Sequence, residues 1–501
     1  MCAFVGTTEK ALVKLMLGKQ EHRGPDGNRY WQDSTFAFGH SLLDINGETQ
    51  YQPYITRNGN VVVFNGEMYD SDIQNDTMWL AEGLDNYGQK LLESCDWHGS
   101  VAWYKPEENE IVLFRDHFGT KPLWYRIEGE RFEFSTSLKS FLYKKSKNDF
   151  REFHNNPQWF GDKTPFINIY KVAPGEIIVY DTKNRRIKRK GNLWTYFDIR
   201  PEKLYSGIFR KKITNSIRKI AKNINKTGLF LSGGMDSTLI LSLLKDIPEL
   251  DLHVFSCGYT DELDSFGQYY HDMANEIKMA EQTCREYGIP ITTVQLSQSK
   301  RDHYGKMWLA NTHYPWSDKN RTAPRYLLAK TAAEHGCKVI LTGDSGDELF
   351  TGYIHHTPRL EKDWKFNYNL PKWFPQKPLN RKDQLSDSLF NDLLLTSENN
   401  ILATDQTCGM FGMESRIPLL TQSFAKYVLN IQGEVKFRQH KDYRNGTYKF
   451  LMREVMRDYL PDHVKNRKHK TGWSSPWDNN HPAVRPTWLN EDIEFIKTVA
   501  K

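Results

Sequence analysis

The chain has 501 residues, of which 39% are hydrophobic and 26% charged, and its formal net charge is +6. This composition is typical of a globular protein and excludes a collagen-like or disordered chain. Apolar runs are short, as at 61–64 and 339–341, so none is long enough to span a bilayer. The small net charge permits anionic ligands but does not indicate nucleic-acid binding.

The N-terminus and the cysteines predict the compartment. The first residues, MCAFVG, lack the basic start and apolar segment of a secretory signal. The six cysteines form no CxxC pair, and their spacing predicts neither a zinc site nor a disulfide framework. We therefore expect a soluble, cytoplasmic protein without membrane association. The unusual feature is a cysteine at position 2.

The first part of the chain, to about residue 195, is rich in short strands. Turn residues separate the apolar runs, and many strands with few helices predict stacked sheets covered by helices. The basic stretch 181–190 indicates a solvated hairpin turn rather than a nucleic-acid patch, because no aromatic or helical pattern accompanies it. Strands are expected at 59–64, 110–114, 131–135 and 176–180, and helices at 10–17 and 79–92.

From about residue 205 the pattern alternates between strands and helices, which predicts a parallel sheet with helices on both faces. Residues 385–501 read mostly as helices, and 360–381 as a long loop. Helices are expected at 204–224, 237–244, 275–287 and 325–335, and strands at 227–231, 253–257, 291–295 and 338–341.

A glycine loop, SGGMDS at 232–237, follows the strand at 227–231 and precedes a helix. The glycines let backbone N–H groups approach an anion, and the helix N-terminus adds partial positive charge. Serine hydroxyls can donate to phosphate oxygens. A carboxylate such as Asp236 is unfavourable against bare phosphate, so it predicts a bridging Mg²⁺.

A second segment, 342–353, carries three acidic residues among glycines and follows the strand at 338–341. The carboxyl ends of strands are where open α/β sheets bind ligands. We therefore expect Asp347 to share Mg²⁺ with Asp236. Asp344 is expected to act on a substrate amine or as a base.

Removal of Met1 would leave Cys2 with a thiol and a free α-amino group. An amine with a pKa of about 7.7–8.0 can accept the thiol proton near neutrality. Asn65 and Gly66 offer the amide donors that an oxyanion hole needs. With Arg23 as a cation and Asp76 to hold an ammonium group, these residues predict an acyl-transfer site.

Together these motifs resemble, in the same order, those of the glutamine-dependent asparagine synthetases. The resemblance implies an α/β protein with two domains. Residues 1–195 would be a class II glutamine amidotransferase, an Ntn-hydrolase αββα sandwich. Residues 200–501 would be a parallel-sheet PP-loop synthetase (adenine nucleotide alpha hydrolase-like). The matching segments are Cys2, 22–26 (HRGPD), 65–69 (NGEMY), 75–77 (NDT), 115–123 (RDHFGTKPL), 232–237, 342–353, 412–419 (GMESRIPL) and 449–453 (KFLMR).

The resemblance also implies roles for individual residues. The substrates would be glutamine, ATP with Mg²⁺, and aspartate or another carboxylate; ammonia would pass along an interior channel, and a homodimer would be compatible. Implied catalytic residues are Cys2, Asn65, Gly66, Asp344 and Lys449. Implied glutamine-binding residues are Arg23, Asn65, Glu67 and Asp76, and implied metal ligands are Asp236 and Asp347. Implied ATP-binding residues are Leu231, Ser232, Gly233, Gly234, Asp236, Ser237, Cys257, Thr342 and Gly343.

Two departures from the family pattern leave alternatives open. Leu42 stands where the family has an arginine that holds the glutamine carboxylate. Either Arg23 or Arg57 replaces it, or glutamine binding is weakened. The acceptor segment has Asp344 in place of a glutamate, so the acceptor can be aspartate or a sugar, peptide or modified-base carboxylate. A non-catalytic nucleic-acid-binding relative is a further alternative, which the presence of the chemical residues disfavours.

Overall fold

The computed structural model describes residues 2–45, 47, 51–70, 75–141, 162, 164, 166–196, 202–222, 224, 226–260, 277–314, 319–353, 356, 384–437 and 448–467. The loop expected at 360–381 lies outside these residues. Among the described residues, no helix is long and apolar enough to cross a membrane.

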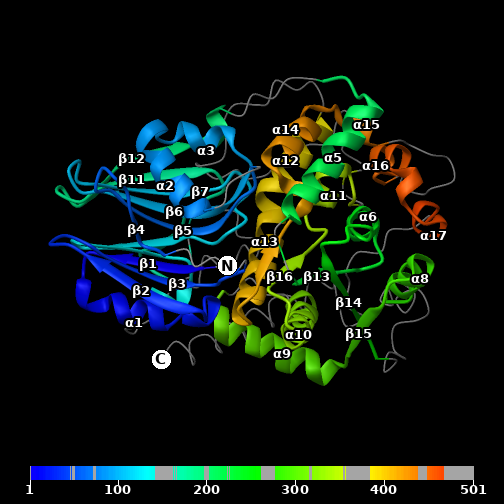
Figure 1. The fold of residues 1–501 in the computed structure, drawn as a ribbon, viewed down its shortest axis with the longest axis horizontal. Coiled ribbons are helices and arrows are strands. Elements are labelled where there is room, and N and C mark those ends of the chain that lie inside the picture. The colour runs from blue at the N-terminus through cyan, green and yellow to red at the C-terminus, as the bar shows by residue number, and fades with distance from the viewer. Residues whose placement is uncertain are drawn as a thin grey trace.

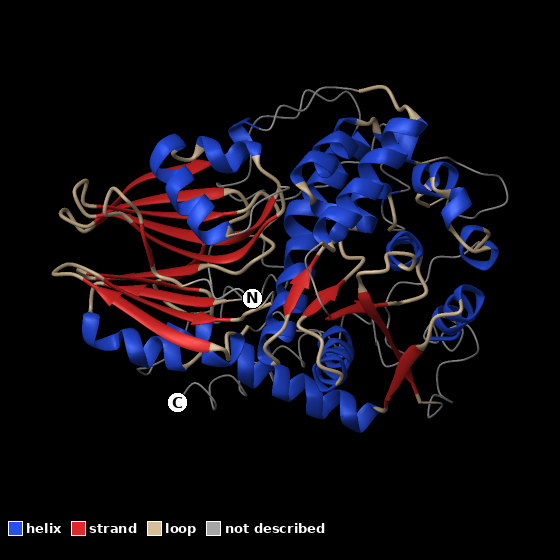
Figure 2. Cartoon of the chain, in the orientation of Figure 1, coloured by secondary structure: helices blue, strands red, loops and turns tan. Residues whose placement is uncertain are grey.

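Two antiparallel six-stranded sheets pack face to face in the first part of the chain (Figures 1 and 2). The first has the order β10-β8-β9-β1-β3-β2 and the second β12-β11-β7-β6-β5-β4. Strands of the first sheet are β1 (Ala3–Thr7), β2 (Gly27–Gln32), β3 (Ala37–Leu42), β8 (Trp124–Glu128), β9 (Arg131–Ser135) and β10 (Ile169–Lys171). Strands of the second are β4 (Tyr54–Ile55), β5 (Val61–Met68), β6 (Trp97–Lys105), β7 (Glu110–Arg115), β11 (Glu176–Asp181) and β12 (Arg186–Asn192).

Side-chain alternation explains why these sheets form a sandwich. Phe4 and Phe38 from the first sheet meet Val61 and Val63 from the second in one buried cluster. The outer faces are covered by α1 (Val13–Gly18) on the first sheet and by α2 (Asp76–Tyr87) and α3 (Lys90–Ser94) on the second. The predicted αββα arrangement is thus confirmed. Short 3₁₀ turns are η1 (Lys10–Leu12), η2 (Glu21–Arg23), η3 (Leu138–Phe141) and η4 (Leu193–Tyr196).

The basic stretch at 181–190 forms the hairpin between β11 and β12, as predicted. Its Lys188 donates to Glu110 of β7, and Lys190 donates to the Tyr125 hydroxyl. These contacts engage two of its charges with the sandwich itself.

A five-stranded parallel sheet forms the centre of the second part, in the order β15-β14-β13-β16-β17. Its central residues alternate between two buried clusters, so helices cover both faces, as predicted. The strands are β13 (Lys226–Phe230), β14 (Asp251–Tyr259), β15 (Ile291–Leu296), β16 (Val339–Leu341) and β17 (Glu414–Arg416). The helices up to the acidic segment are α5 (Ser206–Ile220), α6 (Met235–Leu244), α8 (Ile277–Tyr287), α9 (Gln298–Thr312), α10 (Lys319–Glu334) and α11 (Gly346–Phe350).

The described remainder is mainly helical, as predicted, with η7 (Leu393–Ser397) a π-helical turn. The other elements are α12 (Gln384–Asp392), α13 (Glu398–Met410), η8 (Pro418–Leu420), α14 (Gln422–Asn430), α15 (Gly433–Lys436), α16 (Phe450–Val455), η9 (Arg457–Tyr459) and α17 (Asp462–Lys465).

Several elements were not predicted individually from the sequence, among them α9 and β17 in the second part of the chain. Helix α9 is polar and lacks a clear apolar stripe, but Trp308 and Leu309 anchor it in a buried cluster. Strand β17 is only three residues long and mostly charged. It extends the sheet because β16 offers a parallel partner, pairing Leu341 with Arg416.

Helix α13 lies between the sandwich and the parallel sheet (Figure 1). Glu398 and Asp405, two turns apart, are both buried on it. Glu398 accepts from Arg115 Nη1 at 2.9 Å and from Lys171 Nζ at 2.7 Å. Asp405 accepts from Arg23 Nη2 at 2.7 Å and lies 3.3 Å from Lys121 Nζ. We call these six residues the α13 clamp, since all four cations belong to the sandwich.

Neutralising one clamp carboxylate should destabilise the whole chain. In Glu398→Gln, an amide NH₂ would face Arg115 or Lys171, leaving a buried cation without its counter-charge. We expect a loss of about 3–5 kcal/mol in the free energy of unfolding, measured by urea denaturation. The control is Glu108→Gln, which removes an ion pair with Lys105 in which Glu108 is 60% exposed. Equal denaturation midpoints for both variants would contradict the prediction.

Candidate active sites

One end of the sandwich gathers Cys2, Asn65 and Glu67 between its sheets. Phe4 pairs with His40 across β1 and β3, so Cys2, two residues earlier, lies beside the end of β3. On β5, Asn65 and Glu67 continue the series that begins with the inward-facing Val61 and Val63. The two sheets therefore present these residues toward the same space.

Asn65 is fully buried, yet neither Nδ2 nor Oδ1 has a hydrogen-bond partner in the part of the chain that the structure describes. Leaving a buried amide unpaired costs free energy, so such a group indicates a ligand-binding role. The next residue must be glycine. Gly66 has φ +157°, and a Cβ there would lie 2.0 Å from the His98 carbonyl oxygen.

The Cys2 thiol is half-buried, and burial raises its pKa to about 11. Asp76 is the first residue of α2. The preceding residue, Asn75, caps the helix, and its side-chain oxygen accepts from the Met78 amide. Burial raises the pKa of Asp76 to about 6, although its carboxylate accepts from the backbone amides of Thr77 and Met68. At neutral pH the thiol is thus protonated and the Asp76 carboxylate mostly ionised.

Arg416 of β17 brings a guanidinium from the second part of the chain to this site. Its Nη2 donates to Glu67 Oε2 and its Nε to Glu414 Oε1, both at 2.7 Å. The two carboxylates share one cation, and their pKa values move apart. Burial raises the pKa of Glu67 to about 8. Burial also acts to raise the pKa of Glu414, but the positive charges of the amino terminus, Lys121 and Arg416 outweigh it and lower that pKa. Glu414 is therefore the ionised partner.

Of the two arginines considered for the glutamine carboxylate, Arg23 is engaged with an acidic partner and Arg57 lies away from Asn65. Arg23 is buried and donates to Asp405 in the α13 clamp. Arg57 lies in the exposed turn between β4 and β5, at the far end of β5 from Asn65. A carboxylate-binding role for either one remains a prediction.

The glycine loop and the acidic segment meet at the carboxyl edge of the parallel sheet. They follow β13 and β16, which are neighbours. Gly233 has φ +74°, and the Gly234 amide donates to Ser232 Oγ at 3.2 Å. Ser237 Oγ lies 3.3 Å from Ser232 Oγ. Two glycines of the acidic segment touch the loop: added Cβ atoms would lie 2.9 Å from the Ser237 amide at Gly343 and 2.3 Å from Asp236 Oδ1 at Gly346.

Two other residues expected at the nucleotide site border this edge. The Leu231 amide donates to the Phe255 carbonyl on β14, and Cys257 follows two residues later. Both side chains are buried, and burial raises the pKa of the Cys257 thiol to about 12. They offer apolar surface rather than a reactive group.

Asp344 is held by two threonine hydroxyls. Its Oδ2 accepts from Thr342 Oγ1 at 2.8 Å and from Thr404 Oγ1 at 3.1 Å. Thr404 lies on α13, next to Asp405 of the clamp. The acidic segment is therefore fixed to the same helix that contacts the sandwich.

Lys449, at the start of α16, is buried with its Nζ paired to Asp236 and, at 2.6 Å, to Asp347 Oδ1. Burial alone would lower its pKa, but the two carboxylates raise it. Mg²⁺ in phosphate sites is typically held by one or two carboxylates together with substrate phosphates and water. Two converging carboxylates fit that donor set. Among described residues, no group of three or more His, Cys, Asp or Glu forms a metal cluster.

The sequence predicted the glycine loop at 232–237 and the acidic segment at 342–353, but it did not predict the contacts between the two parts of the chain. Arg115, Lys121 and Arg416 were noted only as members of motifs. Glu398 and Asp405 were not singled out. The available signal was a polar helix, ENNILATDQTCGM, that is nevertheless almost entirely buried.

Comparison with known proteins now places the chain. A family model described as asparagine synthase matches residues 209–486, more than half of the chain, and one described as a glutamine amidotransferase domain matches residues 1–191. A fold and paired sites of this kind define a glutamine-dependent amidotransferase. The chain belongs to the asparagine synthase family.

Curated relatives have low sequence identity to this chain, but they match over most of its length. A glutamine-hydrolysing asparagine synthetase of Bacillus subtilis is 24% identical over 610 aligned positions, covering 100% of this chain and 90% of the relative. The enzyme of that name from Rattus norvegicus is 22% identical, covering 96% and 83%. A protein named amidase chry2 from Gibberella zeae is also 22% identical, covering 90% and 83%.

Cys2 should be the first cysteine to be alkylated in the native protein, since it is half-buried and the other five are buried. In protein that retains Met1, the pKa of this thiol is raised to about 11, so its thiolate fraction should rise with pH. The rate with iodoacetamide should increase about tenfold per unit between pH 7 and 9. Peptide mass spectrometry reports both site and rate. Earlier modification of another cysteine, or a pH-independent rate at Cys2, would contradict this.

Proposed function

We propose that the protein is a glutamine-hydrolysing asparagine synthetase, converting glutamine, aspartate, ATP and water to asparagine, glutamate, AMP and PPi. One observation carries the proposal. The same chain holds an unpartnered, buried Asn65 amide beside Cys2 and, across the α13 clamp, a glycine loop opposed to Asp344 and Lys449. The asparagine synthetase relatives support the choice of product.

In the sandwich, Cys2 is the nucleophile toward the glutamine side-chain amide. Its thiol proton passes to the α-amino group that Met1 removal exposes, which offsets the raised pKa of the thiol. Asn65 Nδ2 and the Gly66 amide stabilise the oxyanion. Collapse of the tetrahedral intermediate breaks the C–N bond, the protonated α-amino group returns its proton to the leaving nitrogen, and ammonia departs to leave a thioester. Water then hydrolyses the thioester to glutamate and the free thiol. Asp76 holds the substrate ammonium group with its ionised carboxylate, and Glu67 contributes a neutral carboxyl oxygen as a further acceptor for glutamine.

In the second part, ATP binds with its phosphates against the loop of Ser232 to Ser237 and the N-terminus of α6. Leu231 and Cys257 contact adenosine, together with Thr342 and Gly343. Asp236 and Asp347 are the residues that would hold Mg²⁺, which supplies charge compensation for the phosphates. The acceptor carboxylate attacks the α-phosphorus of ATP, which releases PPi and forms an acyl-adenylate; ammonia then attacks the acyl carbon and displaces AMP. Lys449 places a fixed positive charge beside the adenylate phosphate. Asp344 orients the acceptor amine.

Ammonia must cross between the sites without becoming ammonium. We place its path beside α13 and β17, the elements that contact both sites. The α13 clamp sets four cations against two carboxylates. This excess of positive charge repels the ammonium ion but has no such effect on neutral ammonia.

A second candidate is an amidotransferase of the same architecture with a different acceptor carboxylate. The amidase-named relatives and Asp344, one methylene shorter than the family glutamate, favour it. This candidate keeps every step at Cys2 and the nucleotide site. It differs only in which carboxylate is activated.

Incubation with aspartate and ATP tests the proposal, with glutamine or ammonium chloride as nitrogen donor. We expect asparagine and equimolar AMP from both donors. Cys2→Ala should abolish glutamine-dependent product while ammonia-dependent product remains within about twofold, because the nucleotide site is untouched. Loss of both activities in Cys2→Ala would contradict two separate sites. AMP formation only with another carboxylate would select the second candidate.

Gly346→Ala should impair the nucleotide site specifically. Its Cβ would lie 2.3 Å from Asp236 Oδ1, so Asp236 must move. Losing one charged contact typically lowers affinity by a factor of roughly 10–100, and we expect that loss in ATP use, measured as AMP formation. Gly207→Ala is the control, since nothing lies within 4 Å of its added Cβ. Unchanged ATP dependence in Gly346→Ala would refute the assignment.

A further inference from the structure

Arg416 touches both halves of the molecule with different parts of one residue. Its side chain is buried and makes three hydrogen bonds: to Glu67 and Glu414 at 2.7 Å, and from Nη1 to the Ile220 carbonyl at 3.1 Å. The guanidinium also lies 5.5 Å from the ring centre of Tyr69. It is therefore fixed in one orientation by contacts in several directions.

The backbone of the same residue belongs to the other site. The Arg416 carbonyl accepts from the Thr342 amide at 3.2 Å, and Thr342 Oγ1 donates to Asp344. Four residues, Asp344, Thr342, Arg416 and Glu67, are thus connected in series by three hydrogen bonds. A shift of β17 by a fraction of its hydrogen-bond length changes both ends together.

Asn65 and Gly66 directly precede Glu67 on β5. Because β5 is paired to β6 at Asn65 with Ser100 and at Glu67 with His98, the strand moves as a unit. Holding the Glu67 carboxylate therefore also fixes the Asn65 amide. An arginine suits this task, since its planar fork can hold two carboxylates and a carbonyl at once, which a lysine cannot.

The geometry points to Arg416 as a positioning residue that couples glutamine hydrolysis to occupation of the acceptor site. It contacts neither reacting atom in this account. It acts by holding Glu67, and with it Asn65, in a position set by the strand beside Thr342. This inference rests on the proposed function and deepens it, by making one residue responsible for matching ammonia release to its use.

The test is Arg416→Lys in the full-length protein, assayed with aspartate and ATP. Wild type should release glutamate faster with both ligands present than with neither. In the variant we expect this stimulation to vanish and the glutamate released per asparagine to rise about threefold or more, a coupling loss within the usual range. Ammonia-supported asparagine synthesis should stay within about twofold, because the synthetase residues are unchanged.

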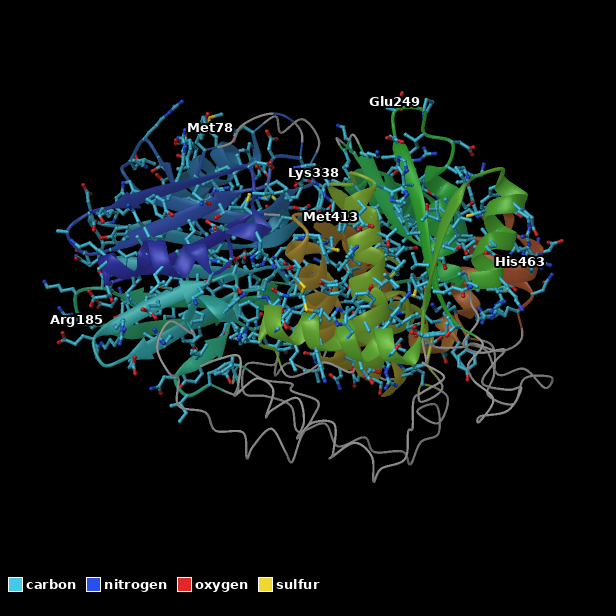
Figure 3. All side chains as sticks on the ribbon, turned by 90° about the horizontal axis from the view of Figure 1, so that it is seen from below. Met78, Arg185, Glu249, Lys338, Met413 and His463 are labelled. Carbon is cyan, nitrogen blue, oxygen red and sulfur yellow. The ribbon has the colours of Figure 1, made fainter. Side chains whose placement is uncertain are left out.

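The matched control is Lys338→Met. Lys338, which lies where the two halves meet (Figure 3), pairs with Asp26 across the same interface but is 41% exposed and does not contact Glu67. It should keep the wild-type ratio. Glu414→Gln, which loosens Arg416 without replacing it, should raise the ratio in the same direction as Arg416→Lys.

Several outcomes would overturn the inference. These are no ligand stimulation in wild type, an unchanged ratio in Arg416→Lys, or an equal rise in Lys338→Met. A parallel fall in ammonia-supported synthesis would show a merely structural role. If wild type makes no asparagine even from ammonia, the proposed acceptor is wrong. The inference is then decided by glutamine hydrolysis alone: a lowered kcat in Arg416→Lys, as expected when the oxyanion donor Asn65 is displaced, supports it, and an unchanged kcat refutes it.

Discussion

The relative placement of the two sites depends on two buried carboxylates of α13. Glu398 and Asp405 lie seven residues apart, about 10.5 Å along the helix, and each has two cationic partners on the sandwich. Burying a carboxylate is expensive unless its charge is compensated by well-placed donors. Any docking of the sandwich that loses these partners leaves ions stranded in the interior. The clamp therefore selects one register among the many that apolar contact alone would allow.

Apolar side chains also pack between the sandwich and the second part of the chain. Tyr69, Phe118 and Trp194 of the sandwich belong to the same buried cluster as the helices around the parallel sheet. Trp194 meets Phe390 edge to face at 5.1 Å between ring centres. Contacts of this type are tolerant of small displacements, whereas charge-assisted hydrogen bonds near 2.7 Å are not. The interface thus combines non-directional apolar contacts with charge-assisted hydrogen bonds that fix its geometry.

Local sequence signals recovered the elements that carry the chemistry, and failed where distant partners decide the structure. Strand, glycine loop and helix at 226–244 were predictable, because apolar runs and glycines report on their own conformation. Strand β17 was not, since Glu-Ser-Arg becomes a strand only beside β16 and with Glu67 to receive its arginine. Helix α13 was predictable as a helix but not as a buried one. The partners of its acids lie about 230 to 380 residues earlier in the chain.

In segment 342–353 the length of one acidic side chain differs from the family pattern, whereas its hydrogen-bond contacts tie it to the rest of the structure. Asp344 is shorter than the glutamate of the family pattern, but its carboxylate is held by Thr342 on one side and Thr404 on the other. Its charge is therefore kept while its reach is reduced, and the group is fixed to α13 beside Asp405. The shorter side chain is thus accommodated without disturbing the helix and strand that join this segment to the sandwich.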